Sequence, residues 1–170
     1  FNFVADDIYV HNTFTMSIKV IHHAYTTEDA YVLIACPYET HVTNIFQEIR
    51  KLIKKSPEIS RSVVRDKKNP HEIEFGNGSK IVGFTSGARS GSKGDSVRGQ
   101  TPTMIVLDEV DRMTDEDLDS IMGARFSNPL GIKLIVASTP TGRRQKFFNW
   151  CVTAQGGRVQ VPPGRYSAKG

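Results

Sequence analysis

Hydrophobic positions along the 170-residue chain follow two periods, one typical of strands and one typical of helices. Three short apolar runs indicate strands buried on both faces, and they lie at residues 31–35, 104–107 and 132–137, the last interrupted only by Lys133. Apolar residues at helical spacing predict helices over residues 13–24 and from Thr40 until Pro57 ends the pattern. Strands that alternate with helices predict an α/β fold with a largely parallel sheet and helices on both faces.

A turn of glycine and asparagine interrupts this pattern in the middle of the chain. Residues 72–75 and 80–84 flank Gly76-Asn77-Gly78, and this arrangement predicts a β-hairpin. The glycine- and serine-rich stretch from Ser86 to Gly99 predicts a mobile loop. Further helices are predicted near residues 116–124 and from Arg143 to about residue 154.

The composition is that of one globular domain rather than of a disordered or membrane-spanning chain. Hydrophobic residues make up 38% of the chain, which is enough for a core. No apolar run reaches the roughly 18 residues that a membrane span requires, and no secretory signal is evident. The chain does not begin with Met and starts within a strand-like pattern, so we expect a fragment or a processed piece.

The cysteines and histidines show no metal-binding pattern. Cys36 and Cys151 stand in apolar surroundings, and we expect both to be buried thiols in a reducing compartment. His22 and His23 fall on the first predicted helix, where we expect them to be partly exposed rather than metal ligands. Trp150, with the two phenylalanines before it, is expected to pack in the core.

The net charge of +4 is concentrated in one segment. Eight basic residues lie between Arg50 and Lys68 and only Glu58 and Asp66 oppose them, so the segment carries 8 − 2 = +6. Such a cluster can contact a polyanion such as DNA. It can equally be a solvated helix face and loop, and the sequence leaves both interpretations open.

The candidate chemistry begins at the acidic end of the run Met104–Asp111. Asp108 and Glu109 directly follow four apolar residues, so they stand at the carboxyl end of a predicted buried strand, where open α/β sheets bind ligands. One such carboxylate can hold Mg²⁺ while its neighbour orients or deprotonates an attacking water. The alternative is an ordinary strand end with two solvated acids.

Two further segments carry groups suited to phosphate chemistry. The strand at 132–137 runs into Ser138-Thr139-Pro140-Thr141-Gly142, whose hydroxyl groups can sense a phosphate and its loss, although such a turn can also be purely structural. Arg98 stands on the glycine-flanked loop before the acidic strand and can reach developing phosphoryl charge. Arg89 and Lys93 of the same loop compete for that role, and contact with DNA or plain solubility are the alternatives.

These segments together resemble the ATPase domain of the large terminase subunit, the motor that packages viral DNA. The resemblance covers residues 13–152. It rests on the apolar-DE strand, the loop Ser96–Thr101 before it, the STPTG turn after it, and the strand VLIACP with the amphipathic helix that follows. It implies a P-loop NTPase-like fold that hydrolyses ATP with the help of Mg²⁺.

The resemblance also implies roles for single residues. Asp108 would bind Mg²⁺, and Glu109 would activate the attacking water. Ser138 and Thr139 would contact the nucleotide and couple its hydrolysis to motion. Arg98 would contact the γ-phosphate, either in its own subunit or in a neighbour.

Partners and location follow from the same resemblance. It implies double-stranded DNA, a small terminase subunit and a portal as partners, a homo-oligomeric ring, no membrane, and action in the cytoplasm of an infected host cell. A helicase-like, DNA-dependent ATPase is the nearest alternative, because its acidic motif and Ser/Thr turn look similar. A nucleic-acid-binding module without catalysis, which would use the basic cluster, is the third interpretation.

The phosphate-binding sequence GxxxxGK[ST] that such a motor needs is missing from the chain. Where Gly-Lys belongs, residues 1–12 stand before the first predicted helix, and they predict two short strands around Asp6-Asp7. This block, from NFVADD through IYVHN to Thr13, resembles the carboxyl-terminal tail of an intein, a self-excising protein insertion. The chain is thus expected to divide into an intein tail with a β-hairpin (1–12), an ATPase core (13–155) and a linker or truncated segment (156–170).

Splicing chemistry would use three successive residues. The Asn12 side-chain nitrogen can attack its own carbonyl carbon and cut the Asn12–Thr13 bond, while His11 protonates the leaving amine. Thr13 would first accept an acyl group as a nucleophile and later, joined to an upstream Gly-Lys, place its hydroxyl on Mg²⁺. An upstream intein segment and flank are then required partners, so the chain alone should neither splice nor bind ATP well. The alternative is an ordinary hairpin that caps the helix with Asn12.

Overall fold

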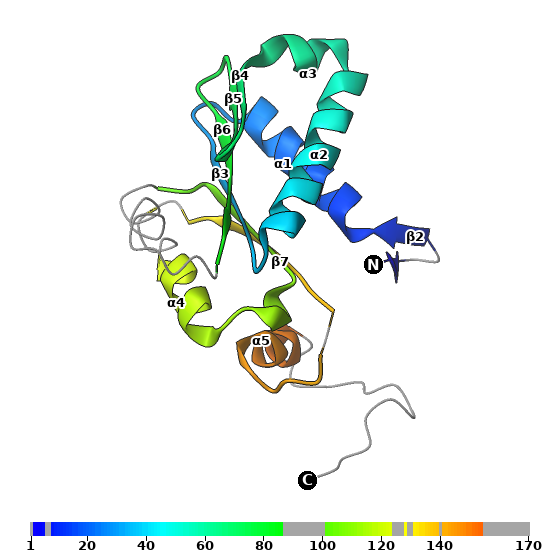
Figure 1. The fold of residues 1–170 in the computed structure, drawn as a ribbon, viewed down its shortest axis with the longest axis vertical. Helices are drawn as coiled ribbons and strands as arrows, with labels where there is room; N and C mark the ends of the chain where they lie inside the picture. The colour runs from blue at the N-terminus through cyan, green and yellow to red at the C-terminus, as the bar shows by residue number, and fades with distance from the viewer. Residues whose placement is uncertain are drawn as a thin grey trace.

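The computed structural model describes residues 2–5, 8–86, 101–123, 128, 131–139 and 141–154 (Figure 1). Its helices are α1 (Asn12–Thr26), α2 (Glu39–Lys55), α3 (Pro57–Ser62), α4 (Asp115–Gly123) and α5 (Lys146–Ala154). A short 3-10 helix, η1 (Val110–Arg112), follows the acidic strand. Within these described residues no helix is both long and apolar enough to cross a membrane.

A six-stranded sheet forms the centre of the described part of the chain. In spatial order its strands are β4 (Val63–Lys68), β5 (His71–Phe75), β6 (Lys80–Thr85), β3 (Tyr31–Cys36), β7 (Met104–Asp108) and β8 (Lys133–Ala137). The neighbours β6, β3, β7 and β8 run parallel, whereas β5 is antiparallel to both β4 and β6. The predicted α/β fold with a mainly parallel sheet flanked by helices is therefore confirmed.

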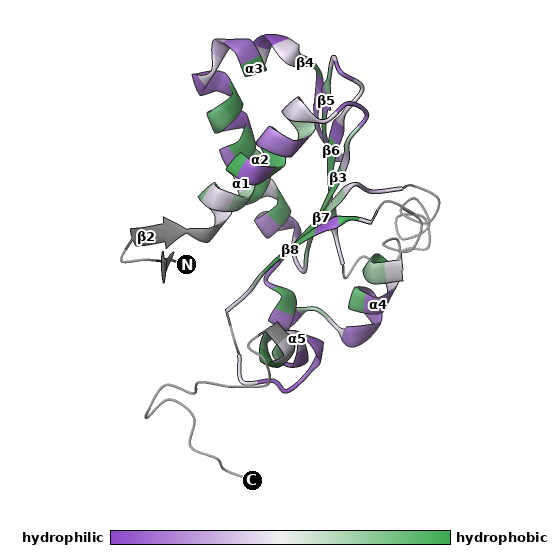
Figure 2. Ribbon diagram, turned by 180° about the vertical axis from the view of Figure 1, so that it is seen from behind, coloured by the Kyte–Doolittle hydropathy of each residue, from purple (hydrophilic) through white to green (hydrophobic). Residues whose placement is uncertain are grey.

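Each face of the sheet packs against its own set of helices. The side chains of β3 alternate, so that Val32 and Ile34 pack with α1 and α2, whereas Leu33 and Ala35 pack with α4. Figure 1 shows α1 and α2 together on one side of the sheet and α4 on the other. Burial on both faces explains why β3 is an unbroken apolar run, and Figure 2 shows the hydrophobic residues concentrated along the central strands.

The hairpin and one additional strand extend the sheet beyond its parallel part. β5 and β6 pair in antiparallel fashion around a turn in which Gly78 has φ 82°, as the sequence predicts. β4 is a strand that the hydrophobic pattern does not predict. Its sequence, VVRDKK, is mostly charged, which an edge strand tolerates because one of its sides faces water.

The remaining helix predictions are correct apart from their ends. α1 and α2 each begin one residue earlier than predicted, at Asn12 and Glu39. Pro57 does end the α2 pattern, but it also begins α3, because a proline at the first helical position has no N–H to leave unpaired. The predicted mobile loop lies, from residue 87 onward, outside the described residues.

A separate two-stranded sheet precedes α1. β1 (Asn2–Ala5) pairs in antiparallel fashion with β2 (Ile8–His11), which confirms the two strands predicted around Asp6-Asp7, themselves outside the described residues. β2 leads directly into α1, and Figure 1 shows this hairpin projecting away from the main sheet.

The prediction that His23 is partly exposed is wrong. Only 6% of His23 is exposed, and its Nε2 lies 2.9 Å from the Thr103 hydroxyl, which also accepts the backbone N–H of Tyr31 at 3.1 Å. Burial lowers the pKa of His23. The helical pattern assigns His23 to α1 but carries no information on its distant partner Thr103. Both cysteines are free thiols, as predicted, but only Cys36 is buried, whereas Cys151 is partly buried.

Candidate functional site

The carboxyl end of β7 carries the first predicted site residue. Asp108 is the last residue of β7 and stands in register with Ala137 of β8. Its carboxylate is half-buried, its Oδ1 accepts the backbone N–H of Glu109 at 3.0 Å, and burial raises its pKa. Asp108 is therefore not the solvated acid of the alternative interpretation.

Glu109 adopts an uncommon backbone conformation. It has φ 54° and ψ 42°, in the left-handed region, which costs roughly 1–2 kcal/mol for a residue with a Cβ. Only 8% of Glu109 is exposed, and its Oε2 has no hydrogen-bond partner within the described residues, although Arg112 Nε lies 3.5 Å away as an ion pair. Backbone strain combined with a buried, unsatisfied carboxylate oxygen is typical of functional sites.

Asp111 joins the end of the acidic strand to the turn after β8. Only 3% of this residue is exposed. Its backbone N–H donates to the Ser138 hydroxyl at 2.9 Å, and its Oδ2 accepts hydrogen bonds from both the backbone N–H and the hydroxyl of Thr141. The predicted Ser/Thr turn is thus held against the predicted catalytic strand through one buried carboxylate.

Sequence reasoning assigned no role to Asp111. The available signal was its place as the third carboxylate after the same apolar run, two residues beyond Glu109. Its partner Thr141 is 30 residues away in the chain, so only the pairing of β7 with β8 brings the two together.

The pKa of the buried Cys36 thiol is affected by the carboxylates at this edge of the sheet. Cys36 ends β3, beside β7. Burial raises its pKa, and the negative charges of Asp108, Glu39 and Glu109 raise it further. A thiol held neutral in this way is a poor nucleophile, so Cys36 is not a candidate nucleophile of this site.

The structure describes most, but not all, of the other predicted site residues. Thr13 lies in the first turn of α1 and is partly exposed. His11 ends β2 and Asn12 begins α1, and only the backbone is described for both. Ser138 and Thr139 directly follow β8, whereas Arg98 lies outside the described residues.

Carboxylates at this edge fit a magnesium–nucleotide ligand better than a metal cage made of protein alone. No group of three or more His, Cys, Asp or Glu side chains within the described residues could hold a metal ion. Mg²⁺ is usually bound through one or two carboxylates, with phosphate oxygens and water completing its shell. Asp108 suits that arrangement, and Oε2 of Glu109, which is ion-paired with Arg112 but accepts no hydrogen bond from the described residues, can accept one from a water.

Ion pairs neutralise part of the predicted basic cluster. Arg65 and Lys67 of β4 face Glu74 and Glu72 of β5, with N–O distances of 3.6 and 3.3 Å. The charge of +6 counted along the segment therefore overstates the charge of this surface, because the count leaves out Glu72 and Glu74 on the neighbouring strand β5. Lys54, Lys55 and Lys68 make no ion pair within the described residues and are exposed.

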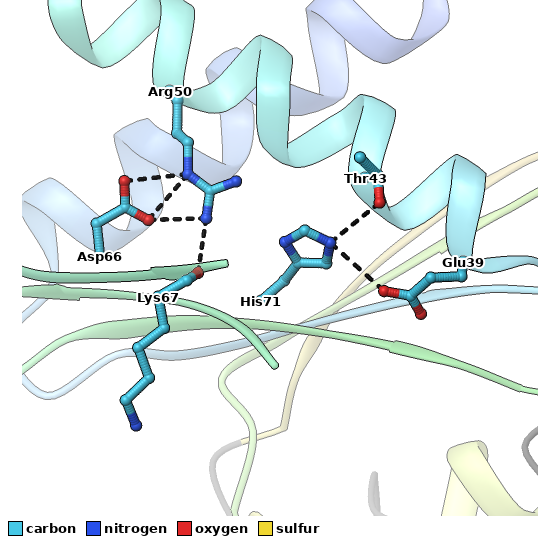
Figure 3. A network of polar contacts seen from close by, with 6 residues as sticks. All are labelled: Glu39, Thr43, Arg50, Asp66, Lys67 and His71. Atoms are coloured by element: carbon cyan, nitrogen blue, oxygen red, sulfur yellow. Dashed lines mark hydrogen bonds and ion pairs between the residues drawn. The ribbon is translucent and has the colours of Figure 1, made fainter. Parts of the chain in front are cut away.

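A polar network ties the basic segment to α2 (Figure 3). The Arg50 guanidinium donates to both carboxylate oxygens of Asp66, at 2.8 and 3.0 Å, and to the carbonyl of Lys67 at 2.7 Å. His71 is buried, its ring stacks on Phe46 with 5.0 Å between centroids, and burial lowers its pKa. Arg50, Asp66 and His71 thus serve structure, and the exposed basic residues of the segment that have no ion pair within the described residues are Lys54, Lys55, Arg61 and Lys68.

A family model described as "DEAD/DEAH box helicase" matches residues 13–145 of the chain. No curated protein matches the chain by sequence. Among solved structures, the fold is similar to the large terminase of bacteriophage HK97, with a TM-score of 0.71 and 13% identity over 85% of this chain and 30% of that one. It is also similar to the large terminase ATPase domain of Thermus phage P74-26, with a TM-score of 0.66 and 15% identity over 82% of this chain and 59% of that one.

A third similar structure contains a nucleotide analogue. It is the large terminase of the thermophilic bacteriophage D6E in complex with ATP-gamma-S, with a TM-score of 0.56 and 18% identity over 76% of this chain and 30% of that one. The chain thus spans between about a third and three fifths of the length of these structures. At these identities the similarity establishes the fold, which is that of P-loop NTPase-like ATPase domains.

We predict that Asp108→Asn is more stable than the wild-type chain at pH 7. An aspartate whose folded pKa is raised binds its proton more tightly when folded, so its ionisation lowers the free energy of unfolding as pH rises. The amide removes that cost and keeps the oxygen that accepts the Glu109 N–H. Urea unfolding across pH should show the advantage shrinking as pH falls toward 3.8, the ordinary aspartate value. An advantage that is independent of pH, or equally large for Asp119→Asn at an exposed position, would contradict this.

We predict that Asp111→Ala destabilises the chain by about 1–3 kcal/mol, because the N–H and hydroxyl of Thr141 lose their common acceptor. Hydrogen exchange should accelerate most at residues 138–142. The matched control is Asp119→Ala on α4, whose side chain is 72% exposed and whose loss should change stability by no more than about 0.5 kcal/mol. Equal effects of the two substitutions would show that Asp111 does not hold the turn.

Proposed function

We propose that this chain, which belongs to the DEAD/DEAH box helicase family, is the ATPase core of a large terminase that drives viral DNA packaging. The observation that carries the proposal is the joined edge of β7 and β8, where a strained, buried Glu109 lies beside Asp108. The similarity to three phage large terminases and the Ser96–Thr101 loop before β7 favour a packaging motor within that family.

In this proposal the two acids divide the chemistry of ATP hydrolysis. Asp108 holds Mg²⁺, together with the hydroxyl of Thr13 once Gly-Lys precedes it. Mg²⁺ supplies neutralisation of phosphate charge when it is bound. Glu109 orients and deprotonates the attacking water, for which its unpartnered Oε2 is suited. The ATP-gamma-S complex of the phage D6E terminase supports ATP as the nucleotide.

The turn after β8 senses the state of the nucleotide. Ser138 and Thr139 offer hydroxyl groups at the same edge as Asp108, and Arg98 contacts the γ-phosphate from the preceding loop. Loss of the phosphate changes the hydrogen bonds of the turn. The bonds of Asp111 to Ser138 and Thr141 then transmit that change to the end of β7, which supports coupling of hydrolysis to motion.

The hairpin in front of α1 is assigned to protein splicing. Residues 1–12 form the tail of an intein, residues 13–155 the ATPase core and residues 156–170 a linker or truncated segment. Asn12 cyclises, His11 protonates the leaving amine and Thr13 acts as the nucleophile. The paired strands β1 and β2, which deliver His11 directly to the start of α1, support this assignment.

DNA contact is assigned to the cationic rim formed by Lys54, Lys55 and Lys68. These exposed side chains are free of ion pairs within the described residues, so they can neutralise phosphates of double-stranded DNA. A small terminase subunit, a portal and further copies of the chain in a ring complete the motor in this proposal. The family match itself favours a second candidate, a helicase-like DNA-dependent ATPase, which would separate strands instead of translocating a duplex.

We predict that Glu109→Gln in the complete, spliced protein lowers the rate of ATP hydrolysis by about 10²–10⁴-fold, because the amide cannot accept a proton from water. DNA binding, measured by filter retention, should not change. Glu116→Gln, at an exposed position on α4, is the matched control and should hydrolyse ATP at the wild-type rate. A Glu109→Gln protein with wild-type ATPase activity would remove the basis of the proposal. Strand separation on forked DNA would favour the helicase over the terminase.

A further inference from the structure

Glu109 and Arg112 face one another across a single turn at the start of η1. The backbone N–H of Arg112 donates to the carbonyl of Glu109 at 3.0 Å, which closes that turn. A 3-10 turn brings side chains at positions i and i+3 to the same side of the helix. Arg112 Nε accordingly lies 3.5 Å from Oε2 of Glu109.

This contact is an ion pair and not a hydrogen bond. Its length of 3.5 Å exceeds the roughly 2.7–3.2 Å of an N–H···O hydrogen bond. Oε2 of Glu109 is buried and accepts no hydrogen bond from the described residues, so it keeps its capacity as an acceptor. Arg112 can thus restrain the Glu109 carboxylate by charge attraction and still leave Oε2 to a water.

The backbone between the two residues is held in place by burial. Val110 and Asp111 are 1% and 3% exposed. The N–H of Asp111 donates to the Ser138 hydroxyl, and its carboxylate accepts the hydroxyl of Thr141. The Arg112 side chain therefore starts from a fixed position, and it reaches Glu109 without the cost of first ordering a loop.

Stability alone does not explain the pair. The Arg112 side chain is 47% exposed, and ion pairs at such exposure contribute little to stability because water screens them. The Glu109 side chain is only 11% exposed, and its backbone is in the left-handed region. The pair therefore acts mainly on the direction of a carboxylate that is already buried. Direction matters for a catalytic group, since a misplacement by about 1 Å can lower a rate about 10²-fold.

We propose that Arg112 is a positioning residue for ATP hydrolysis, whose ion pair holds the Glu109 carboxylate in the direction of the attacking water. In that step the water oxygen bonds to the γ-phosphorus and a proton of the water passes to Oε2 of Glu109. The bond from that phosphorus to the bridging oxygen breaks as ADP leaves. Arg112 acts only through Glu109, and this inference rests on the proposed function.

Replacement of Arg112 in the complete, spliced protein tests this role. Arg112→Gln removes the charge, so kcat should fall about 10–10²-fold, whereas KM for ATP should not change. Arg112→Lys keeps a charge at the end of a long side chain and should retain most of kcat. Wild-type or increased kcat in Arg112→Gln would overturn the proposal, as would an Arg112→Gln protein that does not fold, because the pair would then serve stability.

Arg65→Gln is the matched control. Arg65 lies on the edge strand β4, its side chain is 52% exposed, and it forms a 3.6 Å ion pair with Glu74. Its replacement removes a similar ion pair at a different edge of the sheet and should leave kcat at the wild-type value. An equal loss of kcat in Arg65→Gln and Arg112→Gln would contradict a specific action on Glu109.

A double variant tests whether Arg112 acts through Glu109. Residues that act as a unit have strongly non-additive effects on rate. Glu109→Gln combined with Arg112→Gln should therefore hydrolyse ATP at the same rate as Glu109→Gln alone. A further loss in the double variant would show that Arg112 acts independently of Glu109 and would overturn the proposal.

The Glu109 side chain in the 170-residue chain offers a readout without nucleotide. Side-chain scalar couplings measured by NMR should indicate one χ1 rotamer of Glu109 in the wild-type chain and in Arg112→Lys, and averaging between rotamers in Arg112→Gln. The urea midpoint of unfolding should be the same in all of these chains, because the pair contributes little to stability. A single Glu109 rotamer in Arg112→Gln would overturn the proposal.

The two proposals can fail separately. Averaging of the Glu109 rotamer in Arg112→Gln, in a protein whose complete form has no ATPase activity, would support the restraint of Glu109 by Arg112 and contradict the proposed function. An active ATPase whose Arg112→Gln variant keeps the wild-type kcat would contradict the positioning role alone.

Discussion

The buried carboxylate of Asp111 is the interaction on which the candidate site depends. It satisfies the N–H and hydroxyl of Thr141 while its own N–H donates to Ser138, so one residue fixes the end of β7 against the turn after β8. A buried carboxylate is costly unless it is fully hydrogen-bonded. These hydrogen bonds therefore favour one position of the turn relative to the end of β7.

The sheet makes that interaction possible, because β7 and β8 are neighbours in it. Parallel pairing of β3, β7 and β8 brings Cys36, Asp108 and the Ser138 turn to one edge. Burial raises the pKa of the Cys36 thiol there, and the negative charges of Asp108, Glu39 and Glu109 raise it further. Asp108 is held there at a cost in stability, as burial raises its own pKa.

Local patterns in the sequence were sufficient for most of the fold. Buried strands such as β3 and β7 are continuous apolar runs, and α2 shows a clear helical period, so each was predicted from neighbouring residues alone. β4 was missed because an edge strand is charged, and His23 was placed at the surface because Thr103 lies 80 residues away. Asp108 and Glu109 are candidates because of their place after an apolar run, whereas the backbone strain at Glu109 and the hydrogen bonds of Asp111 arise from tertiary structure.

ATP binding to two forms of the protein tests the central claim most directly. Isothermal titration calorimetry with Mg²⁺ and a non-hydrolysable ATP analogue would compare the 170-residue chain with the spliced product, whose intact mass must equal both flanks without the insertion. The account predicts tight, saturable binding by the spliced product and much weaker binding by the 170-residue chain, because the proposal puts residues 1–12 where Gly-Lys is required. Equally tight binding by both forms would contradict it.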